Sequence, residues 1–209
     1  MPPSWKISSE LDVPGMIPPG HCQEIKNLAQ SLNEGSTVLE IGVWLGRSTW
    51  CWLSYLPENC SLISIDPFVI QKPEKQAKKQ KKTWANPKID EIMEFALANG
   101  DQQTFHSIIN LHPRKHLLKK LFVGTSQDYA EQNPNDMYDV VWIDGDHLYE
   151  AIDKDLKNFE NRTKIICGDD YHESLPDVIK AVDEMIKRTG KKFYRSNLDQ
   201  PMNRFWKSE

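Results

Sequence analysis

The sequence of 209 residues lacks the features that mark several broad classes of protein. No apolar run approaches the ~18 residues that a membrane-spanning helix needs. The N-terminus, which begins Met-Pro-Pro-Ser-Trp-Lys, has no hydrophobic signal-peptide core. From these two absences we expect a cytoplasmic protein that has no membrane partner.

The chain also has few cysteines and a small net charge. The four cysteines form no Cys-x-x-Cys pair and mostly lie in or beside apolar runs, so we expect buried free thiols rather than disulfides or a zinc site. The formal net charge of −4 argues against nucleic acid as the main partner. The length favours a single domain over residues 1–209, which is long enough to bury a sizeable core.

The most informative stretch is residues 38–49, Val-Leu-Glu-Ile-Gly-Val-Trp-Leu-Gly-Arg-Ser-Thr. An apolar run leads into an acid, two glycines four residues apart, and residues that start a helix well. This pattern predicts a strand, a tight turn and a helix, in which a Cβ would block the turn or the approach of a ligand. Because such a turn directs N–H groups and a helix N-terminus beyond the strand, the stretch predicts a nucleotide or nucleoside site.

The rest of the chain alternates between predicted strands and helices, which favours a parallel sheet with right-handed crossovers. Residues 1–35 predict an irregular, proline-rich segment followed by a helix over 21–33. Residues 70–116 are longer than a plain crossover needs and predict an insertion that could form a substrate lid, with a basic, solvated run at 70–82. The predicted strands are 38–41, 61–65, 121–123, 138–143 and 164–167, with closing strands at 191–196 and 203–207.

Polar residues collect directly after the predicted strands, where open α/β sheets bind their ligands. Asp66 follows the second strand, 24 residues beyond Gly42, and is placed to accept hydrogen bonds from ribose hydroxyls. The complete set of these residues is Glu40, Asp66, Ser126, Asp144, Asp146, His147, Asp169 and Asp170.

Three of these carboxylates, Asp144, Asp169 and Asp170, would converge if the fourth and fifth strands are neighbours. Crowded carboxylates repel and raise one another's pKa unless a cation is bound, and oxygen ligands favour Mg²⁺, Ca²⁺ or Mn²⁺. Such an ion could lower the pKa of a substrate hydroxyl. His147, three residues after Asp144, could take the hydroxyl proton.

Other polar residues favour structural interpretations. Asp146 is expected to cap the helix that begins near His147. The remaining histidines in the first two thirds of the chain show no partner pattern, and we interpret them as surface or hydrogen-bonded core residues. They are His21, His106, His112 and His116.

The ordered set of motifs resembles a known family. Residues 38–49 look like motif I of class I S-adenosylmethionine-dependent methyltransferases. Residues 142–150 (Trp-Ile-Asp-Gly-Asp-His-Leu-Tyr-Glu) and 166–171 (Ile-Cys-Gly-Asp-Asp-Tyr) are similar to macrocin-type, metal-dependent sugar O-methyltransferases. The resemblance runs from about residue 36 to 188 without 70–116. It implies an α/β, Rossmann-like methyltransferase fold, with a mostly parallel seven-stranded sheet, helices on both faces and an antiparallel C-terminal strand.

The resemblance also implies a reaction and a set of site residues. S-adenosylmethionine would donate a methyl group to a hydroxyl of a small molecule, sugar or diol-like, with a divalent cation (Mg²⁺ first) assisting. His147 and Asp144 would be catalytic, and Asp144, Asp169 and Asp170 would hold the metal. The cofactor-binding residues would be Glu40, Gly42, Gly46, Ser48, Thr49, Asp66, Thr125, Ser126 and Asp144. The oligomeric state is left open, with a homodimer as one option.

The sequence departs from the family pattern at two points. The turn carries two glycines where many methyltransferases have three, and Asn161-Arg162-Thr163 stands in place of the usual Pro-Gly-Gly before the fifth strand. The first departure concerns the geometry of the cofactor turn, and the second concerns only a surface turn.

Three alternatives stay open at this point. A nicotinamide-dependent oxidoreductase would expect Gly-x-Gly-x-x-Gly, whereas this turn is Gly42-x-x-x-Gly46. A metal-dependent glycosyltransferase could use Asp144-Gly145-Asp146 but would leave Glu40 unexplained. A non-catalytic nucleoside-binding module would need neither His147 nor the acidic pair.

Overall fold

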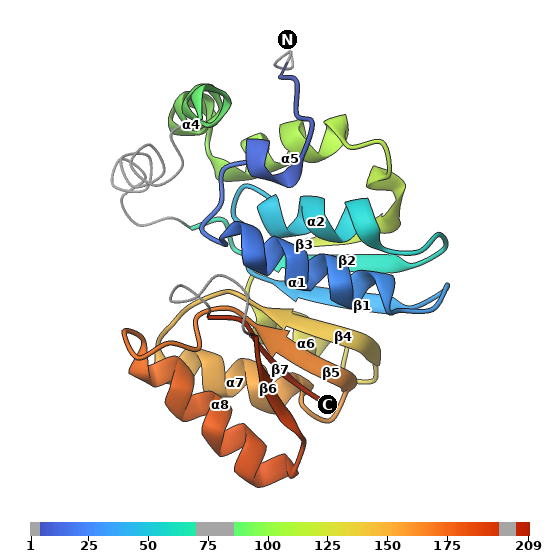
Figure 1. Cartoon of the computed structure of the whole chain (residues 1–209), viewed down its shortest axis with the longest axis vertical. Coiled ribbons are helices and arrows are strands. Elements are labelled where there is room, and N and C mark those ends of the chain that lie inside the picture. Colours follow the sequence, from blue (N-terminus) through green and yellow to red (C-terminus); the bar gives the residue numbers. More distant parts are fainter. Residues whose placement is uncertain (1–4, 70–85, 197–203) are drawn as a thin grey trace.

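Seven strands form one mixed sheet in the computed structural model of the chain, which describes residues 5–69, 86–196 and 204–209 (Figure 1). The order is β3-β2-β1-β4-β5-β7-β6. The pairs among β1 to β5 are parallel, and β7 runs antiparallel to both β5 and β6. The strands are β1 (Thr37–Ile41), β2 (Ser61–Asp66), β3 (Leu118–Val123), β4 (Tyr138–Ile143), β5 (Thr163–Gly168), β6 (Phe193–Arg195) and β7 (Trp206–Ser208). The predicted fold class is confirmed.

Helices cover both faces of the sheet, with α1, α2 and α5 on one side and α6, α7 and α8 on the other (Figure 1). They are η1 (Glu10–Asp12), α1 (Pro19–Gln30), α2 (Arg47–Tyr55), α4 (Pro87–Asn99), α5 (Asp101–Leu111), η2 (Lys115–Leu117), α6 (Ser126–Gln132), α7 (Tyr149–Phe159) and α8 (Pro176–Thr189). No helix in these three described ranges is both long and apolar enough to cross a bilayer.

The central strands are buried on both faces because their alternate side chains enter two different cores. Val140 and Trp142 of β4 pack with α1 and α2, whereas Val141 and Ile143 pack with α7 and α8. This explains why β4 is a continuous apolar run rather than an alternating one. The cysteines belong to the core as predicted, since all four are buried and free.

Several predicted boundaries move. Helix α1 begins at Pro19 rather than residue 21, because proline is tolerated in the first turn, where no intrahelical partner for an N–H exists. Helix α7 begins at Tyr149, so His147 lies in the preceding turn and not at the helix start. Strand β3 starts three residues earlier than predicted, and the closing strands are shorter. The predicted basic run 70–82 lies outside the described residues.

The described part of the predicted insertion is built into the fold. Helices α4 and α5 bury Ile92, Met93, Phe105 and Ile108 in the same core as α2. This part therefore contributes to the packing behind the first βα turn.

Candidate active site at the carboxyl edge of the sheet

The turn between β1 and α2 lies directly against the end of β4. Gly42 has a φ of +86°, and a Cβ placed on it would lie 2.0 Å from the carbonyl oxygen of Asp144. The Gly42 N–H donates to the Ile65 carbonyl (2.9 Å), and the Asp144 N–H donates to the Ile41 carbonyl (2.8 Å). Only glycine allows this approach, so the turn and the β4 end are held side by side.

The missing third glycine of the turn has a structural counterpart in Trp44, whose φ is +43°. A left-handed backbone is costly for a side chain of this kind, by about 1–2 kcal/mol. The carboxylate of Asp66 offsets this cost, because its Oδ2 accepts from the N–H groups of both Val43 and Trp44 at 2.8 Å. Its Oδ1 accepts from the Phe68 N–H at 2.6 Å. Asp66 thus lies at the predicted place, where it holds the turn, and its contact with a ribose stays a prediction.

Glu40 is fully buried behind the turn. Its Oε2 accepts from the hydroxyls of Thr49 and Ser64, each at 2.8 Å, which ties β1 to α2 and β2. Burial raises the pKa of Glu40 to about 7, although hydrogen bonds from Ser48, Ser64 and Thr49 oppose the rise. The predicted cofactor residues Glu40, Ser48 and Thr49 are therefore buried groups that shape the turn from behind.

The insertion adds residues that the sequence did not single out for this site. Phe105 of α5 packs against Gly46, where a Cβ would lie 3.1 Å from its ring. Asp101, the first residue of α5, lies near Asp66 and the Trp44 side chain, and burial, with Asp66, raises its pKa to about 6. No motif identified Asp101, because its segment matches no pattern on which the prediction was built.

Thr125 and Ser126 follow β3 and begin α6. The Thr125 hydroxyl accepts from the Asp128 N–H (3.1 Å) and donates to the Asp128 carboxylate (2.6 Å), which forms a capping box. The Ser126 hydroxyl donates to Asp155 of α7. Both hydroxyls are used in local structure, and the predicted adenine contact remains untested.

The acidic ends of β4 and β5 meet beside the turn. One ligand atom each from Asp144, His147 and Asp170 lies within 4.8 Å of the other two. His147 Nε2 is 2.5 Å from Asp170 Oδ2, and Arg204 Nη1 donates to Asp170 Oδ1 at 3.0 Å. Asp170 itself has a φ of +68°, and these two partners hold its carboxylate on both sides.

The charges in this group shift one another's pKa values. Burial, followed by the charges of Asp169 and Asp170, raises the pKa of Asp144 well above its usual range. Hydrogen bonding to Asp170 raises the pKa of His147. Burial alone would raise the pKa of Asp170, but His147 and Arg204 outweigh it and lower the pKa.

The comparison with known families decides what kind of protein carries this arrangement. Residues 39–171 match the family model described as a methyltransferase domain. The chain belongs to this methyltransferase family. The recognition of a class I methyltransferase is thereby confirmed, and it favours methyl transfer over the oxidoreductase and glycosyltransferase alternatives. No curated protein sequence gives a significant match.

Solved structures share the fold of this methyltransferase at low sequence identity. The O-methyltransferase from Bacillus cereus in complex with SAH is 14% identical, with a TM-score of 0.55 over 92% of this chain and 81% of that one. TomG from Streptomyces achromogenes, an O-methyltransferase involved in tomaymycin synthesis and solved with SAM, is 12% identical, with a TM-score of 0.58 over 92% of this chain and 80% of that one. Cofactor-bound Rv0187 from MTB is 13% identical, with a TM-score of 0.62 over 95% of this chain and 83% of that one.

The donor set at the acidic end fits a divalent cation. Two carboxylates and an imidazole converge, and burial together with the neighbouring charges of Asp169 and Asp170 disfavours the charged form of Asp144, which a bound cation would favour. The grouping differs from the predicted trio, because His147 joins Asp144 and Asp170 while Asp169 lies with its Oδ1 2.9 Å from His21 Nδ1. Whether Asp169 also ligates a metal stays a prediction.

His21 is a further residue at this methyltransferase site whose place the sequence did not predict. Of the two predicted interpretations, surface or hydrogen-bonded core, the second holds, because His21 is fully buried and its Nε2 accepts from the Arg204 N–H; its position 2.9 Å from Asp169 was not predicted. Its distance from the acidic motifs in the sequence concealed the contact. Asp146 was expected to cap the helix that begins near His147, and its role is indeed structural. Its Oδ1 accepts from the Leu148 N–H (3.0 Å) and so stabilises the turn before α7.

The neighbourhood of His147 is a small pocket, and a separate open hollow lies on α8. Asp144, His147, Asp169, Asp170 and Trp206 are among the residues that line the small pocket.

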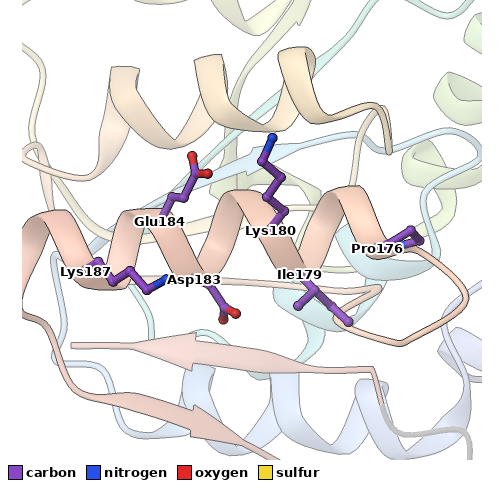
Figure 2. Close-up of a pocket in the computed structure, with 6 residues that line it drawn as sticks. All are labelled: Pro176, Ile179, Lys180, Asp183, Glu184 and Lys187. Carbon is purple, nitrogen blue, oxygen red and sulfur yellow. The ribbon is translucent and has the colours of Figure 1, made fainter.

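The hollow on α8 is lined by residues of that single helix: Pro176, Ile179, Lys180, Asp183, Glu184 and Lys187 (Figure 2). Lys180 Nζ lies 3.9 Å from the centre of the Tyr149 ring, and Glu184 accepts from the Tyr149 hydroxyl at 2.6 Å. Lys180 and Glu184 therefore connect α8 to Tyr149, the first residue of α7.

Gly42→Ala tests whether the approach of the turn to β4 needs glycine. We expect a loss of stability well above the ~1–2 kcal/mol that a left-handed backbone alone costs, together with loss of cofactor binding. Gly35→Ala is the matched control, because Gly35 has a similar φ of +81° but no atom within 4 Å of the added Cβ. Chemical denaturation of both variants gives the comparison, and equal losses would contradict the steric argument.

Glu40→Gln tests the buried carboxyl. A folded-state pKa of about 7, raised from 4.5, means that the folded protein binds more protons than the unfolded chain between these values. Wild-type stability relative to Glu40→Gln should therefore fall by up to ~3 kcal/mol as the pH rises from about 4.5 to 7. Denaturation of both proteins across this range measures the difference, and parallel pH profiles would refute the assignment.

Proposed function

We propose that this methyltransferase transfers the methyl group of S-adenosylmethionine to a hydroxyl of a small molecule, with His147 as the general base. One observation carries the proposal. His147, whose side chain is 47% exposed, presents Nε2 to Asp170 at 2.5 Å beside the first βα turn. A histidine held by a carboxylate in this way is oriented for proton transfer.

The pairing with Asp170 selects the tautomer of His147. If Nε2 carries the proton that Asp170 accepts, Nδ1 keeps the lone pair that can accept the proton of an acceptor hydroxyl. Arg204 holds the other oxygen of Asp170, so the carboxylate cannot rotate freely away from the ring. The raised pKa of His147 makes it a stronger base once it is neutral.

The reaction we propose is an in-line displacement. The acceptor O–H bond breaks as its proton moves to His147 Nδ1, the oxygen forms a bond to the sulfonium methyl carbon, and the S–CH₃ bond breaks. S-adenosylhomocysteine leaves as a neutral thioether. The chain's own contribution is to align the two reactants across the contact between Gly42 and Asp144 and to hold the proton acceptor in place.

A divalent cation, Mg²⁺ first, fits the two carboxylates of the donor set, with His147 kept as the base and not as a ligand, and when bound it would lower the pKa of the acceptor hydroxyl. Asp144 and Asp170 would hold it, with Asp169 as the further predicted ligand. A sugar or diol-like acceptor suits such a site, because two neighbouring hydroxyls can face one ion.

Binding of S-adenosylhomocysteine tests the first half of the proposal. We expect it to raise the melting temperature in a thermal shift assay, because a ligand at 100 times its Kd stabilises the folded state by about 2.7 kcal/mol. NAD and a UDP-sugar, each with and without Mg²⁺, serve as controls and should give no comparable shift. The absence of a shift with millimolar S-adenosylhomocysteine would rule the proposal out.

His147→Ala tests the second half. Removing a general base should lower turnover by a factor of ~10²–10⁴ while S-adenosylhomocysteine still binds. Turnover is measured as S-adenosylhomocysteine release in a screen of sugars, diols and catechol-like compounds. His116→Ala, which changes an exposed histidine on η2, is the control. Unchanged turnover in His147→Ala would show that another group takes the proton.

A further inference from the structure

His21 connects three distant parts of the chain at the acidic end of β5. It lies in the first turn of α1, and none of its surface is exposed. Its Nδ1 is 2.9 Å from Asp169 Oδ1, and its Nε2 accepts from the backbone N–H of Arg204 at 3.1 Å. The contact at Nδ1 is a close approach without hydrogen-bond alignment, whereas the contact at Nε2 is a directed hydrogen bond.

These contacts fix the orientation of the ring. A ring nitrogen that accepts a hydrogen bond carries no proton, so in the neutral form the proton of His21 is on Nδ1, the nitrogen that lies 2.9 Å from Asp169 Oδ1. The edge of the ring also packs against Phe205, with ring centres 6.4 Å apart. One ring nitrogen of His21 therefore lies against Asp169 in the site, and the other accepts from the backbone of Arg204, just before β7.

Both acids that follow β5 depend on this connection. Asp169 is buried, and its Oδ1 also accepts from the Asp170 N–H at 2.6 Å. Asp170 is reached indirectly, because the backbone N–H of Arg204 bonds to His21 while the guanidinium of Arg204 bonds to Asp170. The indole of Trp206 completes the arrangement by donating to the Asp169 carbonyl at 3.2 Å.

We propose that His21 is a positioning residue, whose Nδ1 packs against the Asp169 carboxylate and whose Nε2 accepts from the Arg204 backbone, so that both acids after β5 keep their places in the site. This inference rests on the proposed function and adds a residue of the N-terminal helix to it. Groups that orient metal-binding or catalytic carboxylates typically change metal affinity or activity by ~10–100-fold when removed.

Two substitutions separate positioning from packing. His21→Leu fills the space but removes both ring nitrogens that contact polar groups, whereas His21→Asn can place an amide N–H near the position of Nδ1. We expect His21→Leu to weaken Mn²⁺ binding and to lower kcat, each by ~10–100-fold, with S-adenosylhomocysteine affinity unchanged. We expect His21→Asn to recover much of both losses.

His112→Leu is the matched control. His112 is the other buried histidine among the described residues, and it packs on Trp50 and contacts the Ser54 hydroxyl at 3.0 Å, apart from the acids. This variant should lose stability but keep Mn²⁺ affinity and kcat. Mn²⁺ binding is followed by electron paramagnetic resonance titration, and S-adenosylhomocysteine binding by calorimetry, on the full chain.

The outcomes distinguish this inference from the proposed function. A wild-type protein that does not bind S-adenosylhomocysteine would refute the proposed function itself. If the wild type binds S-adenosylhomocysteine, the positioning role is overturned when His21→Leu keeps the Mn²⁺ affinity and the kcat of the wild type. Equal losses in His21→Leu and His21→Asn, or losses of S-adenosylhomocysteine binding as large as those of Mn²⁺, also overturn it. Should His21→Leu fail to fold, His21→Asn decides, because the role requires it to retain Mn²⁺ binding.

Discussion

The approach of Gly42 to the backbone of Asp144 is the constraint on which the rest of the site depends. At this point β1 and β4 are parallel neighbours, so their carboxyl ends lie side by side and the turn after β1 contacts Asp144. Two backbone hydrogen bonds, from Gly42 to Ile65 and from Asp144 to Ile41, lock the three strand ends together. The seat proposed for the methyl donor and the proposed reacting groups are thereby brought together by backbone geometry, before any side chain is considered.

The second theme of the site is the balance of buried negative charge. Burial, followed by the charges of Asp169 and Asp170, raises the pKa of Asp144. Asp170 is compensated by His147 and Arg204, and Asp169 lies beside His21. Such an unequal distribution leaves one carboxyl that would gain from a cation, while the others are already held in place.

Prediction from the sequence succeeded where one segment contains all the needed information. The strand, turn and helix start at 38–49 could be recognised because an apolar run, an acid, two glycines and helix-starting residues lie within a few residues of one another. It was less successful for side-chain partners. Glu40 and Asp66 were both placed at the correct strand ends, but the sequence did not show that one is buried against Thr49 and Ser64 and that the other holds the backbone at Trp44.

The sequence by itself determined the fold class, the order of the elements and the strand ends at which polar groups collect. Hydrophobic periodicity and turn chemistry are local properties, and the parallel sheet follows from them. Only the tertiary structure decided which of those polar groups meet. His21 faces Asp169 and Arg204 holds Asp170, because these contacts depend on how α1 and the last strand pack against β5. Contacts between segments so distant in sequence leave no local pattern, which is why they could be seen only once the chain was folded.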